Sequence, residues 1–402
     1  ALISACVLSL IATAGWSQSL TWLGTLGGSQ SHAYGISADG RVVVGESHNA
    51  SGHGRAFRWT LDGIMQDLGA PDGANSGATG VSADGSVVVG WIYASGYGNA
   101  FLWTTAGGME YLGTLGGYSS DASDVSADGS VVVGSASNDS GQVRAFRWTA
   151  ARGMQDLGTL GGAHSGATGV SADGRVVVGW ANNAAGLSRA FRWTQWSGIQ
   201  DLGTLPGHTQ STAYGVSADG RVVVGVSIDA AWQPRAFRWT AAGGMQDLGT
   251  LGSGTSYAYS VSADGNIVVG WSANSAGLTR AFRWTPAGGM EDLNHTYACL
   301  LTPGSELRYA LDISPDGRYI VGYGYNATTG RIEGYLLNTS SPPNSNGDVN
   351  RDGCVDDIDL LGMLFEFGEL ANDFNRCMDA NRDGIIDDAD LLIVLFNFGQ
   401  GC

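Results

Sequence analysis

The residues whose types and spacing best suit a defined chemistry lie near the C-terminus, where oxygen-bearing side chains recur in two matching loops. One loop begins at Asp348, and the second begins 31 residues later at Asp379. Both loops carry such side chains at positions 1, 3, 5, 9 and 12, a glycine at position 6 for a sharp turn, and a usable carbonyl at position 7. Calcium prefers oxygen ligands of this kind, so we expect two Ca²⁺ ions here. The expected ligands are Asp348, Asn350, Asp352, Cys354, Asp356 and Asp359 in the first loop and Asp379, Asn381, Asp383, Ile385, Asp387 and Asp390 in the second.

Each loop leads into an apolar segment with a helical pattern, at residues 360–367 and 391–398. No helix is expected before the first loop, because Pro342, Pro343 and Gly347 occupy its place. A calcium loop with an exiting helix, present twice and with Asp at position 12, resembles a type I dockerin over residues 346–400 more than an EF-hand pair. The resemblance implies a small all-α module that folds with calcium and binds cohesin modules.

In the dockerin family, loop positions 10 and 11 help to select the partner. The corresponding residues here are Asp357, Ile358, Asp388 and Ala389, where Ser or Thr is more usual. An alternative stays open, in which the module is a terminal cap that is stapled by calcium and binds no cohesin. A body of this size depends on its metal in either case.

The rest of the chain is organised by an internal repeat. Its clearest copy reads Val170-Ser-Ala-Asp-Gly-Arg-Val-Val-Val-Gly179. The seven copies, called repeats one to seven below, begin at Ile36, Val81, Val125, Val170, Val216, Val261 and Ile313. Asp-Gly between apolar runs predicts a hairpin turn, because Gly adopts positive φ without strain. The uninterrupted run of valines predicts a strand that is buried on both faces.

Each repeat is expected to hold four short strands, at residues 167–171, 175–179, 189–194 and 199–203 in repeat four. That is the content of one propeller blade. The seventh repeat runs into Pro342 before a fourth strand, whereas residues 20–24 align with the fourth strand of the other repeats. We therefore predict a mainly β fold, a seven-bladed β-propeller closed by its N-terminal strand, followed by the small all-α calcium-binding domain.

Five repeats carry an Arg in the third strand and an Asp nine residues later. These pairs are Arg58/Asp67, Arg147/Asp156, Arg192/Asp201, Arg238/Asp247 and Arg283/Asp292. In repeat two both positions change together, to Leu102 and Tyr111. The joint change predicts a structural Arg–Asp ion pair within each blade, because losing one partner of a buried pair costs more than replacing both.

The repeats resemble the HAF repeat of exported bacterial proteins over about residues 20–338. Three motifs carry the resemblance: Asp156-Leu-Gly-Thr-Leu-Gly-Gly162, Val170-Ser-Ala-Asp-Gly174 and Arg189-Ala-Phe-Arg-Trp193. The resemblance implies an extracellular β-propeller-like domain without a settled activity.

Charge divides the chain into two parts. The formal net charge is −17, and residues 345–402 alone hold 13 acidic residues and three arginines. The repeat region is close to neutral, so nucleic acid is not an expected partner. The predicted domains are a signal-peptide-like apolar segment at 1–18, the propeller at 19–340, a linker at 341–347 and the calcium-binding domain at 348–402.

Residues 1–15 are apolar and include an A-x-A pattern at residues 12–14, as in the apolar core of a secretory signal, and they are short for a stable membrane span. Beyond Cys6, which lies in this segment, four cysteines are available for disulfides in an exported chain. Of the three possible connectivities we favour Cys354–Cys402 with Cys299–Cys377.

The repeats show no recognisable catalytic constellation. The six His occupy different repeat positions, and none has a zinc-like spacing. Asp121 and Asp124 depart most from the repeat, and we interpret them as a solvated surface pair, although paired carboxylates for glycoside hydrolysis stay open. The connections between second and third strands vary most, and their aromatic residues suit stacking on sugars, packing on a protein partner or simple covering of blade edges. These aromatic residues are Trp91, Tyr93, Tyr97, Trp180, Trp232 and Trp271.

Together these features predict a secreted, non-catalytic protein of the cell surface or extracellular space. Its expected partners are a cohesin-like module or other copies of itself, with carbohydrate as a further candidate for the propeller. One alternative is the subunit of a filament or surface layer assembled head to tail. A second alternative is a polysaccharide-active enzyme carried by a dockerin.

Overall fold

A computed structural model describes residues 18–71, 73–94, 96–340, 349, 355, 357–369, 378 and 385–399. The chain divides into two compact units, and each is described by itself. The larger unit comprises Leu20–Tyr297 and Leu301–Leu337, and the smaller one contains Asn338–Cys402 and Ala298–Leu300. Among the described residues, no helix combines the length and the apolar character needed to cross a bilayer.

The larger unit is mainly β, and its strands recur in the order that the repeats predict. The first strands are β2 (Gly27–Ile36), β6 (Asn75–Val81), β10 (Gly116–Val125), β14 (Gly161–Val170), β18 (His208–Val216), β22 (Gly252–Val261) and β26 (Glu306–Ile313). The second strands are β3 (Val42–Asn49), β7 (Val87–Ala94), β11 (Val132–Asn138), β15 (Val176–Asn183), β19 (Val222–Asp229), β23 (Val268–Asn274) and β27 (Tyr319–Asn326). The third strands are β4 (Gly54–Thr60), β8 (Tyr97–Thr104), β12 (Val143–Thr149), β16 (Ser188–Thr194), β20 (Pro234–Thr240), β24 (Thr279–Thr285) and β28 (Arg331–Asn338). The fourth strands are β5 (Met65–Asp67), β9 (Gly108–Tyr111), β13 (Gly153–Asp156), β17 (Gly198–Asp201), β21 (Gly244–Asp247) and β25 (Gly289–Asp292).

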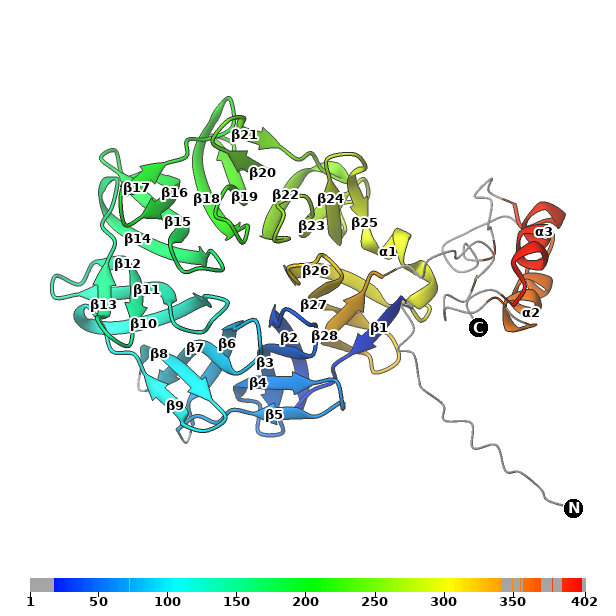
Figure 1. The fold of residues 1–402 in the computed structure, drawn as a ribbon, viewed down its shortest axis with the longest axis horizontal. Helices are drawn as coiled ribbons and strands as arrows, with labels where there is room; N and C mark the ends of the chain where they lie inside the picture. The colour runs from blue at the N-terminus through cyan, green and yellow to red at the C-terminus, as the bar shows by residue number, and fades with distance from the viewer. Residues whose placement is uncertain are drawn as a thin grey trace, which may run out of the picture. The chain divides into compact units, whose positions relative to one another are not determined.

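The sheets of repeats two to six each have four strands in sequence order, and Figure 1 shows all the sheets set around a common axis, as in a β-propeller. The strands of repeats one and seven join one larger sheet through a single parallel pair, Gln30 with Ile332. The short strand β1 (Ser19–Trp22) pairs with β28. Beyond it, the Leu23 amide donates to the Gly334 carbonyl at 2.9 Å.

The predicted Asp-Gly hairpins are confirmed. In repeat one, the Ser37 amide donates to the Val42 carbonyl at 2.9 Å, and Gly40 has φ of 73°. The Asp39 carboxylate accepts from the Ser37 hydroxyl and from the Arg41 amide, so the side chain holds the turn that the glycine permits. These turns join the first and second strands.

The valine strands are buried on both faces, as predicted. Val42 and Val44 pack with residues of repeat two, including Phe101. Val43 faces the other way and packs in a cluster with Val321 of repeat seven. Alternate side chains of a strand point to opposite faces, so each second strand contributes to the cores on both of its sides.

A β-bulge recurs at the same place in every first strand. In repeat one, Ala33 pairs with Gly45 and Gly35 pairs with Val44, so Tyr34 is the extra residue. A Cβ on Gly45 would lie 1.9 Å from the His32 carbonyl oxygen, which explains the glycine that ends each Val-Val-Val run. The residues at the bulge are Tyr34, Thr79, Ser123, Thr168, Tyr214, Tyr259 and Leu311. Bulges re-aim side chains, and these seven lie around the axis.

Backbone hydrogen bonds link successive repeats around the axis. In five repeats, the alanine before the Asp-Gly turn donates its amide to the carbonyl of the corresponding residue in the next repeat. The observed bonds are Ala38 to Ala83, Ala83 to Ala127, Ala127 to Ala172, Ala172 to Ala218 and Ala263 to Pro315, at 2.9 to 3.2 Å. Repeat seven has Pro315 at this position, and proline has no N–H to donate.

The predicted Arg–Asp ion pairs involve the wrong arginine. Asp67 is opposite Phe57 in register, so it shares a face with Arg55 and not with Arg58. The Arg55 Nε atom lies 3.8 Å from Asp67, whereas the Arg58 Nε atom donates to the Gly85 carbonyl of the next repeat at 3.3 Å. The same arrangement joins Arg144 to Asp156, Arg235 to Asp247 and Arg280 to Asp292, and joins Arg147, Arg192 and Arg238 to carbonyls of the following repeat.

Short helices complete the described structure. Helix α1 (Leu293–Thr296) follows β25, and a 3₁₀ turn spans Ala298–Leu300. In the smaller unit, α2 (Asp357–Phe365) and α3 (Asp388–Asn397) pack through Met363 and Val394. Both helices begin three residues earlier than the sequence suggested. Asp387 and Asp390 form a capping box at the start of α3.

Candidate functional site

The candidate site is the axial opening of the larger unit. A cavity of about 240 Å³ runs along the axis, between the bulges and the alanines that precede the Asp-Gly turns. A second cavity of about 460 Å³ forms its mouth, on the side away from those turns. The two cavities share the bulge residues as lining. First strands therefore place one variable side chain per repeat at the boundary between them.

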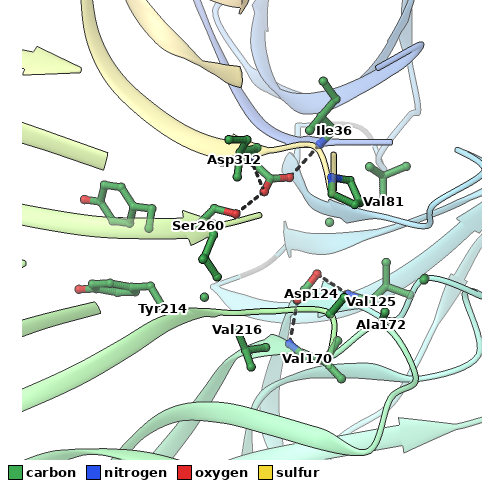
Figure 2. Close-up of a pocket in the computed structure, with 18 of the residues that line it drawn as sticks. Ile36, Val81, Asp124, Val125, Val170, Ala172, Tyr214, Val216, Ser260 and Asp312 are labelled. Carbon is green, nitrogen blue, oxygen red and sulfur yellow. Dashed lines mark hydrogen bonds between the residues drawn. The ribbon is translucent and has the colours of Figure 1, made fainter. Parts of the chain in front are cut away.

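Two carboxyl groups face the axial cavity, as Figure 2 shows. Asp124 accepts from the Val125 amide at 2.7 Å and from the Val170 amide of the next repeat at 2.9 Å. Burial raises the pKa of Asp124, the two amides lower it and the Asp312 carboxyl raises it, and the net value is about 7. Asp124 thus joins repeats three and four as an acid that holds its proton near neutral pH.

Asp312 has the same position in repeat seven. It accepts from the Ile36 amide of repeat one at 3.0 Å, from the Ser260 hydroxyl of repeat six at 2.7 Å, and from the Ile313 amide at 2.9 Å. Burial raises its pKa to about 6. The other repeats have Gly or Ser at this position, so these two acids depart from the repeat at the axis.

The interpretation of Asp121 and Asp124 as a solvated surface pair is wrong. Asp124 lines the axial cavity. Burial also raises the pKa of Asp121, and its Oδ1 atom is enclosed beside Gly98. Asp121 lies opposite Ser135 and Asp124 opposite Val133, so the bulge between them reverses the alternation that a spacing of three residues would give.

Eight aromatic rings form an unbroken series on one side of the mouth, called the aromatic arc below, and six of them line the cavity itself. The arc runs through Tyr214, Tyr259, Tyr257, Trp271, Tyr309, Tyr323, His32 and Tyr34. Neighbouring ring centroids are 4.3 to 6.3 Å apart, and the Tyr257–Trp271 and Tyr309–Tyr323 pairs are stacked. The rings come from repeats five, six, seven and one.

The other side of the mouth is lined by small side chains. Repeats two, three and four have Thr79, Ser123 and Thr168 at the bulge. The indole rings of repeats two and four do not join the arc. Trp91 lies against Gly77 and Trp180 lies against Gly166, where a Cβ would come within 2.8 Å of the ring. The mouth is therefore asymmetric although the repeats are alike.

The arc ends in a group of side chains that can carry protons. Burial lowers the pKa of His32, and the nearby His48 lowers it further. Burial raises the pKa of Tyr34, and the Glu46 carboxylate adds to the effect. Glu46 lies opposite His32 in register and accepts a hydrogen bond from Tyr34, and burial raises the pKa of Glu46 as well. The imidazole is thus neutral and the phenol protonated near pH 7.

The aromatic residues that were expected on variable loops lie in three different environments. Trp271 belongs to the arc, and Trp91 and Trp180 pack on glycines. Tyr93, Tyr97 and Trp232 are exposed. Sequence reasoning missed the tyrosines of the first strands, which an alignment of the seven repeats at the bulge position would have singled out.

Most of the expected calcium ligands lie outside the described residues: Asp348, Asn350, Asp352, Cys354, Asp356, Asp379, Asn381 and Asp383. Of the others, Asp359 and Asp390 are completely buried, while Ile385 is exposed and Asp387 caps α3. The expected partner-binding residues Asp357, Ile358, Asp388 and Ala389 are exposed at the starts of α2 and α3. Among the described residues, no cluster of three or more His, Cys, Asp or Glu side chains is placed to hold a metal ion. Cys299 is disulfide-bonded, and the other four cysteines lie outside the described residues.

No family model and no curated protein matches this chain. Among solved structures, oligogalacturonate lyase from Vibrio parahaemolyticus gives a TM-score of 0.54 at 12% identity, over 79% of this chain and 93% of that one. Oligogalacturonate lyase in complex with manganese gives 0.54 at 13% identity, over 83% and 95%. TolB from Acinetobacter baumannii gives 0.44 at 14% identity, over 75% of this chain and 65%, less than two thirds, of that one. The likeness to the lyases shows the fold, that of a β-propeller.

These comparisons correct the prediction of a non-catalytic protein. An enzyme, oligogalacturonate lyase, is built on this fold at 12 to 13% identity. The sequence argument for a non-catalytic protein relied on the lack of a recognisable motif in the repeats. That argument fails, because catalytic groups on a propeller can come from strand positions that carry no local motif. The resemblances to HAF repeats and to dockerins stay predictions.

Proposed function

We propose that this chain is an enzyme that acts on a carbohydrate polymer bound over the aromatic arc. The observation that carries the proposal is the arc, in which eight rings touch in series on one side of the mouth. Aromatic side chains offer large apolar faces together with a polar tip, which suits the mixed surface of sugars. A series of rings suits a chain of sugar units better than one small molecule. The fold is also that of an enzyme named for its action on oligogalacturonate.

The chemistry falls to His32 and Tyr34. Cleavage of a glycosidic link by elimination removes a proton from a ring carbon, breaks the bond to the leaving oxygen and delivers a proton to that oxygen. A neutral His32 is suited to take the first proton, and a protonated Tyr34 is suited to give the second. After this step His32 carries one extra proton and Tyr34 lacks one, so transfer of a proton from His32 to Tyr34 restores both groups, while Glu46 orients the phenol through their hydrogen bond. Groups whose pKa values are pushed apart in one site are the expected acid and base.

The test is a cleavage assay with the full chain on polygalacturonate, alginate, galactan and xylan. We expect new chain ends from at least one polymer, measured as reducing ends and as unsaturated ends, which separate hydrolysis from elimination. Trp196→Ala is the control, because Trp196 is 86% exposed on a turn at the opposite face and lies outside the arc. A wild-type chain that neither binds nor cleaves any of the four polymers would contradict the proposal.

We further propose that the larger unit is a closed, seven-bladed propeller in which β1 completes the last blade. The proposal is supported by the pairing of β1 with β28, by the edge contact of Trp22 with Tyr335 at 6.2 Å, and by Asp312, which bonds across to repeat one. Deletion of residues 1–23 should lower the melting temperature sharply, because it exposes Leu336 and the edge of β28. Deletion of residues 1–17 is the matched control and should leave that temperature unchanged.

For the smaller unit we propose two bound calcium ions, with the ligand set expected from the sequence. The fit is supported by Asp359 and Asp390, which are completely buried and lie at position 12 of each loop, the place of a calcium ligand. Asp390→Asn should remove one of two terbium-binding sites, and Asp388→Asn, exposed at position 10, should leave both. Calcium and the disulfide at Cys299 both suit a chain that works outside the cytoplasm.

A further inference from the structure

The loops between second and third strands share one scaffold in five repeats. Asn49 accepts from the Ser51 and His53 amides. This turn places the fourth residue of the loop, counted from Asn49 as the first, in the left-handed region of φ. Glycine fills that position in four of the loops. The four glycines are Gly52, Gly141, Gly186 and Gly277, with φ between 72 and 81°.

Repeat five keeps the scaffold and replaces the glycine with tryptophan. Asp229 accepts from the Ala231 and Gln233 amides, both at 2.9 Å, as Asn49 does in its own loop. Trp232 therefore has φ of 60°, the single positive φ among the described residues other than glycine. A β-carbon is strained in this region, and a bulky side chain more so. The Trp232 side chain is also 71% exposed, so packing against the chain does not compensate for the strain.

We propose that Trp232 is a binding residue for the same sugar polymer as the aromatic arc, at a subsite on the rim of repeat five. The inference rests on the proposed function and adds one requirement, that the substrate is a long chain. Strain at an exposed position is retained where a ligand gains from the side chain. A tryptophan in a fixed backbone conformation offers a large flat surface with little entropy to lose on binding.

The position of the loop fits this role. First strands run from the mouth to the Asp-Gly turns and second strands return, so the loops that follow them lie on the same side as the mouth. From Gly225, which pairs beside the Tyr214 bulge, strand β19 continues four residues to Asp229, about 13 Å at about 3.3 Å per residue. A disaccharide on the arc is too short to reach Trp232, whereas a polymer is long enough.

The experiment measures the full chain by affinity electrophoresis in gels that contain polygalacturonate, alginate, galactan or xylan, and by thermal melting without sugar. Trp232→Gly should weaken retardation by about five- to tenfold in the dissociation constant, as expected for loss of one aromatic contact. The same variant should melt about 2 °C higher, because glycine relieves the positive φ. Trp232→Tyr keeps a ring and should keep most of the binding. Trp196→Gly, on the opposite face, should leave the dissociation constant for the polymer unchanged.

The outcomes separate the two proposals. If wild type binds a polymer and Trp232→Gly binds it equally well, the rim subsite is overturned and the arc stands. If Trp232→Gly weakens binding of a disaccharide as much as that of the polymer, the rim subsite is again overturned, because Trp232 then acts through the arc. If wild type binds none of the four polymers, the proposed function fails, and the subsite with it.

Discussion

The two halves of the mouth differ although the repeats that build them share one framework. Repeats five, six, seven and one supply the aromatic arc, whereas repeats two, three and four have Thr79, Ser123 and Thr168 at the bulge. The bulge, the glycine beneath it and the Asp-Gly turn are the same in both halves. The two halves therefore differ at a few axial positions within one common framework. A repeat protein separates the residues that fold it from those that bind in this way.

The most demanding test of the comparison concerns His32, at the end of the arc. His32→Gln should lower kcat on the polymer that the wild type cleaves by about 10²- to 10⁴-fold, as expected for the loss of a general base. Retardation in the polymer gel should change little, since the arc keeps its other rings. A variant with full activity would exclude the acid–base assignment, and the melting temperature serves as the control for folding.

The arc itself is tested by a matched pair of substitutions at the mouth. Tyr309→Ala removes the ring that contacts both Trp271 and Tyr323, and it should weaken polymer binding by about tenfold or more. Ser123→Ala, on the opposite side, should change binding by less than about twofold. Equal effects from the two substitutions would mean that the whole mouth binds and that the halves do not differ in function.

The axial acids give one titrating group to each half, Asp124 and Asp312. Their pKa values in the folded chain, about 7 and about 6, exceed the ordinary value near 3.9. The folded state therefore binds more protons between about pH 4 and 7, and stability is full at the acid end of that window and is lost as pH rises through it. The melting temperature should be higher at pH 5 than at pH 8. Asp124→Asn should reduce this difference, and Asp312 and Glu46 should maintain the remainder because their pKa values are also raised.

The Asp-Gly turns make the opposite contribution in a separate window. Hydrogen bonds lower the pKa of Asp84 to about 2, so its contribution to stability is lost only below about pH 4. The interval from pH 5 to 8 thus excludes the turn acids, and within it the lowered pKa of His32 acts against the axial acids and Glu46. A melting temperature that rises across this interval in the wild type would contradict the assignment.

The smallest effects are expected from the arginines that join neighbouring repeats. Arg147 donates to the Gly174 carbonyl at 3.1 Å on one half, and Arg238 donates to the Gly265 carbonyl at 3.0 Å on the other. Arg147→Met and Arg238→Met should each cost about 1 kcal/mol in denaturant unfolding, because each removes one charged hydrogen bond to a carbonyl. Unequal costs would show that the framework, and not only the mouth, differs between the halves.

The framework was predictable from the sequence because it is local and repeated. Asp39-Gly40 specifies its own turn, and the valine strand at residues 42–44 specifies its own burial. The ion pairs were mispredicted for a reason that the sequence hides. Arg55 and Arg58 occur together in the same repeats, so the joint change in repeat two fits either one, and only the strand register shows which arginine faces Asp67.

The site was harder to predict, since it depends on contacts between repeats. The bulge at Tyr34 arises from pairing with the next strand, and no local motif marks it. The enclosure of Asp124 depends on repeat four, which supplies the Val170 amide. Aromatic residues were sought on loops, whereas most of the arc comes from strand positions. The seven aligned repeats do contain the signal, as the axial positions are the ones that vary within otherwise uniform strands.

Repeat seven has Pro315 at the position where the other repeats have the alanine whose amide bonds to the next repeat. Five of the six alanines donate their amides to the carbonyl of the corresponding residue ahead, and Pro315 accepts from Ala263 but cannot donate to Ala38. This one backbone bond is therefore missing between repeats seven and one, and Asp312 links the same two repeats through the Ile36 amide instead.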